Sequence, residues 1–186
     1  MKDLNLFKSE DSICLKKIKT KADISEGCDG YLIETSEKEA RNIIASLKDK
    51  KFAGKVGLIG GDDAFNRRAI ETLKIDYLVS PERGDKKDSL KQRDSGINHV
   101  VAKMMKERGV AIVVDLGEVS SLKGKKKALR IERIIQNVKI CRKAFCKIKI
   151  ASLASKKSDL IDEKSRKSVA FSFGMSSSQV SDSVMF

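Results

Sequence analysis

Short apolar runs alternate with amphipathic segments along most of this 186-residue chain. The runs that predict buried strands lie at residues 30–34, 56–59, 75–79, 110–116 and 148–151. The segments between them carry apolar residues at helical spacing, as in the helix that Ser36 would cap and whose inner face would include Ile43 and Leu47. A repeated strand–helix order predicts an α/β fold in which helices connect parallel strands.

The alternation alone does not distinguish an open sheet from a closed barrel. Eight strand–helix units in 186 residues would leave about 23 residues for each, which is enough for an average strand, an average helix and two short loops. Gly54 and Gly109 are expected to end two of the helices. A longer helix, at about 125–145, would turn Leu129, Ile134, Ile135, Val138, Cys141 and Phe145 inward. We expect one domain over residues 1–175, and a Ser-rich tail or short last helix over 176–186.

The charge of the chain is strongly positive and concentrated in one segment. Lys and Arg number 39 against 26 Asp and Glu, which gives a net charge of +13. Residues 123–149 hold 11 basic side chains and a single acidic one, Glu132. Such a patch favours a polyanionic partner, and nucleic acid is the first expectation.

Within this segment the basic side chains alternate with the apolar ones, so we expect them on the outer face of the long helix. The candidate phosphate contacts there are Lys125, Lys126, Arg130, Arg133, Arg142 and Lys143. Aromatic residues make up only 5% of the chain, and we expect none of them to interleave with the basic residues on the outer face. We therefore expect recognition of the backbone and shape of folded RNA rather than base stacking.

His99 is the only histidine, which argues against a metal centre built from several histidines. It lies on the side of its helix that carries Lys103 and Lys106, away from the apolar face. Neighbouring cations favour the neutral imidazole, which can still donate a hydrogen bond to RNA. A structural or RNA-contacting role is favoured over catalysis, because no partner carboxylate lies nearby in the sequence.

Two further features each have a chemical and a structural interpretation. Asp115 and Glu118 follow a strand and could hold Mg²⁺, but a pair that caps the next helix is more common. The glycines of Gly57-x-x-Gly60-Gly61 could surround a phosphate, but the acidic residues that follow them favour a tight turn with a capped helix. We therefore predict no catalytic residue and no metal ligand in this chain.

The four cysteines, Cys14, Cys28, Cys141 and Cys146, form no C-x-x-C pair. Free thiols in a reducing compartment are expected. The first residues lack the long apolar segment of a secretory leader, and no run approaches the length of a membrane span. These patterns predict a soluble cytoplasmic protein with no membrane partner.

Three stretches carry a resemblance to a known family. They are Val79-Ser80-Pro81, then Arg93-Asp94-Ser95-Gly96-Ile97-Asn98-His99-Val100-Val101-Ala102-Lys103, then Gly109-Val110-Ala111-Ile112. In this order they resemble the ribonuclease P protein component 3 family of archaea and eukaryotes. Residues 170–175 are similar to its ending. The chain departs from the family pattern at Ser158-Asp159 and Glu163-Lys164-Ser165, where the family has Trp-Asp and Pro-Arg-Asp.

The resemblance implies a TIM-like (β/α) barrel, compact or slightly incomplete. It also implies a protein subunit of ribonuclease P, the ribonucleoprotein that removes the 5′ leader of precursor tRNA. Its partners would be the ribonuclease P RNA, protein component 2, the other protein subunits and precursor tRNA. The RNA would hold the Mg²⁺ and perform the cleavage, and the protein would bind no cofactor. RNA contacts carry over to Arg93, His99, Lys103, Arg108 and Arg142.

The charge and the resemblance together suggest a mechanism. Arg93, Lys103 and the basic segment 123–149 would neutralise RNA phosphates and so lower the Mg²⁺ needed to fold the catalytic RNA. One alternative is an α/β module that binds structured RNA in another ribonucleoprotein. The other is a metal-dependent phosphoesterase, which a chain with one histidine serves poorly.

Overall fold

The computed structural model describes residues 2–10, 12–25, 27–84, 88 and 94–186, so Arg93 lies outside the described residues. The strands are β1 (Asp3–Asn5), β2 (Ser12–Ile18), β3 (Gly30–Ile33), β4 (Lys55–Ile59), β5 (Tyr77–Val79), β6 (Ala111–Asp115) and β7 (Ile148–Ala151). The helices are α1 (Glu37–Asp49), α2 (Asp63–Thr72), α3 (His99–Arg108), α4 (Leu116–Ser121), α5 (Gly124–Ala144), α6 (Glu163–Ser172) and α7 (Ser177–Ser183). Three short 3₁₀ turns occupy Lys21–Asp23, Pro81–Arg83 and Lys157–Asp159.

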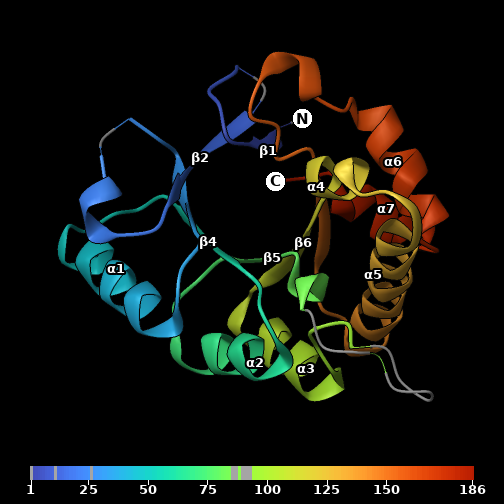
Figure 1. Cartoon of the computed structure of the whole chain (residues 1–186), viewed down its shortest axis with the longest axis horizontal. Helices are drawn as coiled ribbons and strands as arrows, with labels where there is room; N and C mark the ends of the chain where they lie inside the picture. The colour runs from blue at the N-terminus through green and yellow to red at the C-terminus, as the bar shows by residue number, and fades with distance from the viewer. Residues whose placement is uncertain (1, 11, 26, 85–87, 89–93) are drawn as a thin grey trace.

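The strands form one parallel sheet whose spatial order, β1 to β7, follows the sequence. The sheet curves until its two edges meet. Beyond β7, the Leu153 N–H donates to the carbonyl of Leu4 in β1 at 3.0 Å, and the Leu6 N–H donates to the Ala154 carbonyl at 2.9 Å. The result is a nearly closed barrel with helices around it (Figure 1). The predicted TIM-like barrel is confirmed, with seven strands in the described residues rather than eight.

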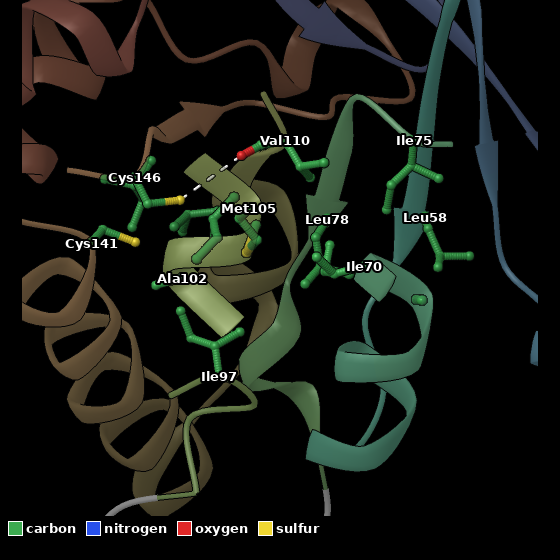
Figure 2. Packing of buried hydrophobic residues seen from close by; sticks show 14 of the residues in the cluster. Leu58, Ile70, Ile75, Leu78, Ile97, Ala102, Met105, Val110, Cys141 and Cys146 are labelled. Carbon is green, nitrogen blue, oxygen red and sulfur yellow. Dashed lines mark hydrogen bonds between the residues drawn. The ribbon is translucent and has the colours of Figure 1, made fainter. Parts of the chain in front are cut away.

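The core has two layers because successive strand residues point to opposite faces of the sheet. In β6, Val113 packs inside the barrel with Leu15 and Leu32, whereas Ile112 packs outward with the helices. Figure 2 shows the outer layer, where Met105 of α3 and Cys141 of α5 pack together with residues of the neighbouring strands and α2. The sheet is therefore buried on both faces, as its continuous apolar strands require.

Local signals in the sequence set most of the helix boundaries. The Asn98 side chain caps α3 by accepting from the Val100 and Val101 N–H groups at 2.9 and 3.0 Å. Gly109 ends that helix with a φ of +71°, as predicted. The prediction that Gly54 ends α1 is wrong. That helix stops at Asp49, because Lys51 already takes a left-handed φ of +53°.

The last turn of α5 also departs from expectation. The helix ends at Ala144, and Phe145 takes a left-handed φ of +56°. This backbone turn directs its side chain away from the inner face of the helix, so the ring is 77% exposed. The prediction that Phe145 faces inward is therefore wrong. None of the helices in the described part of the chain is long and apolar enough to span a membrane.

Candidate nucleic-acid interface

Two neighbouring helices, α3 and α5, bring most of the predicted RNA contacts together (Figure 1). On α3 the exposed candidates are His99, Lys103 and Arg108. On α5 they are Lys125, Lys126, Arg142 and Lys143. The two helices run in the same direction, since each connects one parallel strand to the next, so these side chains extend from one end of the barrel to the other. We call this set the α3/α5 surface.

Within the α3/α5 surface the lysines are the freest cations. The described residues provide no ion pair for Lys103, Lys125, Lys126 or Lys143 within 4.0 Å. Arg142 is more engaged, because its Nε donates to Gln179 Oε1 at 2.9 Å and another guanidinium nitrogen donates to the Gly174 carbonyl. Cations without an internal partner are the ones that gain most from a phosphate.

Arg133 does not belong to this surface, and its predicted place on the outer face of α5 is wrong. It is 4% exposed, and its guanidinium pairs with Asp88 Oδ1 at 2.9 Å. It also donates to the backbone carbonyls of Glu82 and Gly84. Arg133 thus ties α5 to the segment that follows β5, and its charge is already neutralised inside the protein.

Arg130 is intermediate between these two cases. Its side chain is 13% exposed and its Nη1 lies 3.0 Å from Glu118 Oε1. Glu118 Oε1 also pairs with Arg83, whose Nε lies 3.2 Å away, and Arg83 Nη1 lies 3.4 Å from Glu34 Oε1. A continuous chain of ion pairs therefore crosses the carboxyl end of the barrel and holds both arginines. Arg130 is available to RNA only in competition with Glu118.

The ion pairs line a cavity of about 980 Å³ at the end of the barrel where the strands finish. The cavity is bounded by side chains and backbone of Glu34, Gly60, Gly61, Asp62, Phe65, Arg83, Glu118 and Arg130, among others. Asp62 caps α2 by accepting from the Phe65 N–H at 2.7 Å, and the Gly61 N–H donates to Asn66 Oδ1 at 2.8 Å. The interpretation of Gly57-x-x-Gly60-Gly61 as a tight turn before a capped helix is confirmed.

Two buried carboxyl groups lie behind this cavity. Glu82 is fully buried, its carboxyl oxygens have no hydrogen-bond partner among the described residues, and this burial raises its pKa to about 7. Burial also raises the pKa of Asp115 to about 6, while the Glu118 N–H donates to Asp115 Oδ1 at 2.9 Å. Asp115 therefore caps α4, the more common of its two interpretations. Among the described residues no three His, Cys, Asp or Glu side chains converge as metal ligands would.

The sequences of known proteins test the resemblance to ribonuclease P protein component 3. Over 156 residues the chain is 31% identical to ribonuclease P protein component 3 of Methanothermobacter thermautotrophicus, a match that covers 83% of this chain and 60% of the relative. The protein of the same name from Methanocaldococcus jannaschii is 32% identical over 132 residues, covering 69% of this chain and 52% of the relative. The resemblance to ribonuclease P protein component 3 is confirmed. The matches span only about half to three fifths of those relatives' lengths.

Solved structures agree on the fold of this relative of ribonuclease P protein component 3. A chain in a structure described as archaeal ribonuclease P with mature tRNA superposes with a TM-score of 0.72 at 16% identity, covering 94% of this chain and 83% of that one. An amidohydrolase superposes less well, with a TM-score of 0.54 and 35% of its chain covered. No protein-family model matches the sequence.

Sequence reasoning missed two features of the site. The first is the ion-pair chain, because Glu34, Arg83 and Glu118 are far apart in the sequence and no local pattern links them. The second is the surroundings of Phe145, where the exposed side chains of Lys106 and Lys147 lie close to the end of α5. The signal for the second feature was present, because Phe145 lies inside the basic segment 123–149.

Proposed function

We propose that this chain is an RNA-binding protein subunit of ribonuclease P, the endoribonuclease that removes the 5′ leader of precursor tRNA. One observation gives the proposal its main support. His99–Lys103, the end of the longest stretch that resembles ribonuclease P protein component 3, lies in α3, and that helix lies beside α5, whose free lysines extend the same positive surface. Partners in the proposal are the ribonuclease P RNA, protein component 2, the other protein subunits and precursor tRNA.

In the proposed mechanism the protein neutralises phosphates and performs no chemistry itself. Lys103, Lys125 and Lys126 would each replace counterions along the RNA backbone, which favours a compact RNA at lower Mg²⁺. His99 is exposed at the start of α3 and would donate a hydrogen bond to phosphate or ribose. The Mg²⁺ that supports cleavage would be held by the RNA subunit, and the protein would need no cofactor of its own.

The proposal includes a cytoplasmic location. All four cysteines lie in the described part of the chain, and all are free thiols. This state fits a reducing compartment.

Reconstitution tests the proposal. The purified full-length chain would be added, with component 2, to the cognate ribonuclease P RNA, and cleavage of precursor tRNA would be followed at limiting Mg²⁺. We expect cleavage to be stimulated, and the stimulation to be lost when this chain alone is omitted. Tight, salt-sensitive RNA binding without stimulation would instead point to another ribonucleoprotein. Hydrolysis of phosphoesters by the protein without RNA would point to a phosphoesterase.

A further inference from the structure

Phe145 combines a costly backbone conformation with an exposed aromatic ring. The Cys146 N–H donates to the Cys141 carbonyl at 3.0 Å across the end of α5, a hydrogen bond that places Phe145 in the left-handed region. At the corresponding position after α3 the chain has Gly109, which tolerates this conformation without strain. A bulky side chain held in such a position, with its ring exposed, indicates a functional constraint.

The ring is surrounded by positive charge. Lys106 Nζ, from the last turn of α3, lies 5.2 Å from the centroid of the Phe145 ring, within the range of a cation–π contact. Arg142, Lys143 and Lys147 are exposed within three residues of Phe145. Lys106 lies over one face of the ring and leaves the other face for a base. Aromatic side chains combined with nearby cations are the means by which proteins hold single-stranded nucleic acid.

A cavity of about 340 Å³ adjoins the ring. Its polar lining has three basic residues and one acidic residue, with hydroxyl and amide groups from the segment around α7: Arg142, Lys147, Lys149, Asp182, Ser176, Ser178 and Gln179. Cys141 and Cys146 also line it, and Figure 2 shows the Cys146 thiol directed at the Val110 carbonyl. The volume falls within the range of about 300–1,000 Å³ that small-molecule sites occupy.

We infer that Phe145 and this cavity bind one unstacked nucleotide of RNA, with the base on the ring face opposite Lys106 and its phosphate near Lys147. The inference rests on the proposed function and deepens it by adding a base-stacking contact to the phosphate contacts of the α3/α5 surface. An exposed ring would also suit an apolar protein partner. The cations on α3 and α5 favour RNA, since apolar protein interfaces are depleted of lysine.

Two substitutions at Phe145 separate binding from folding. Phe145→Gly removes the ring and suits the left-handed backbone, so the protein should keep its thermal midpoint or raise it. Phe145→Trp keeps an aromatic platform and introduces the only tryptophan of the chain. Phe171→Ala is the matched control, because Phe171 of α6 is 55% exposed and lies outside the lining of this cavity.

The probes are a fluorescein-labelled RNA hairpin with an unpaired six-nucleotide 3′ extension and the same hairpin with a blunt end. We expect Phe145→Gly to weaken binding of the extended hairpin about 5- to 150-fold, the range that loss of one base–aromatic stack predicts. Binding of the blunt hairpin should stay unchanged, as should both affinities of Phe171→Ala. The extended hairpin, and not the blunt one, should quench the emission of Phe145→Trp.

Unchanged binding of both hairpins by Phe145→Gly would overturn the inference and leave the proposed function standing. An equal loss for both hairpins, with a lower thermal midpoint, would assign Phe145 a structural role and overturn it as well. Normal RNA binding with failure to associate with component 2 would make the ring a protein contact. If the wild-type chain bound neither hairpin, the proposed function and this inference would fall together.

Discussion

Basic side chains at the two ends of the barrel have different surroundings. At the carboxyl end, Arg83 and Arg130 form ion pairs with Glu34 and Glu118. Behind them lie two buried carboxyl groups, those of Glu82 and Asp115, whose pKa values are raised by burial. At the amino end, Lys106 and Lys147 surround an exposed ring and have no ion pair among the described residues. Arg83 and Arg130 at the first end are held by ion pairs inside the protein, whereas Lys106 and Lys147 at the second end are available to a polyanion. Basic residues in a sequence therefore predict a binding surface only when those that pair with carboxylates inside the protein are left out.

The largest expected effect tests the structural role of Arg133. In Arg133→Ala the carboxylate of Asp88 and the carbonyls of Glu82 and Gly84 lose a buried donor. Removing one partner of a buried ion pair costs about 3–5 kcal/mol, so the free energy of unfolding in urea should fall by about that much. Lys143→Ala, on the exposed side of the same helix, should change it by less than about 0.5 kcal/mol. Equal stability of the two variants, with weaker RNA binding by Arg133→Ala, would show that Arg133 contacts RNA and does not stabilise the fold.

A somewhat smaller effect concerns the buried Glu82. Its pKa rises from 4.5 to about 7 on folding, so the folded chain holds this proton over a pH range in which the unfolded chain has lost it. The contribution of Glu82 to stability is thus complete below about pH 4.5 and is lost as the pH rises towards 7 and above. Glu82→Gln cannot ionise, and above pH 7 it should be more stable than the wild type by up to about 3 kcal/mol.

The measurement is thermal or urea unfolding of both proteins between pH 4 and 8. Glu107→Gln, a change at an exposed carboxylate of α3, is the control and should follow the wild-type curve. A constant difference between Glu82→Gln and the wild type across this range would show that Glu82 does not titrate on its own, and would weaken the contrast between the two ends.

The third effect compares the ends of α3 and α5, which both lie at the amino end of the barrel. Gly109→Ala meets no atom within 4 Å of the new Cβ, so its only cost is the left-handed backbone, about 1 kcal/mol. Phe145→Gly should act in the opposite direction, with a gain of between zero and about 1 kcal/mol. Differential scanning calorimetry measures both. Loss of stability in Phe145→Gly would mean that the exposed ring supports the fold.

The sequence was sufficient for the elements with strong local signals. The apolar run of β6, the cap at Ser36 and the terminating Gly109 all depend on residues within one helical turn or one strand. Both β1 and β2 were missed. β1 has only three residues, and two lysines interrupt the apolar pattern of β2. The pairing of β1 with the chain after β7 joins residues about 150 positions apart.

The candidate site was predicted in part for the same reason. Lys103, Lys125 and Lys126 are exposed as helical periodicity requires. Arg133 was misplaced because its partner, Asp88, is 45 residues away in the sequence. Phe145 was misplaced because periodicity places a side chain only while the helix continues, and this helix ends one residue earlier without a glycine to mark it.

The central claim is that the free lysines on the α3/α5 surface lower the Mg²⁺ concentration that the catalytic RNA needs for activity. The most direct test is a Mg²⁺ titration of reconstituted precursor-tRNA cleavage with wild type and with Lys103→Glu/Lys125→Glu/Lys126→Glu. The matched control is Lys38→Glu/Lys48→Glu/Lys50→Glu, which reverses three exposed charges in and next to α1, away from α3 and α5 (Figure 1). We predict that the Mg²⁺ optimum rises by about twofold or more in the first variant and stays at the wild-type value in the control. The same optimum for all three proteins would contradict the account.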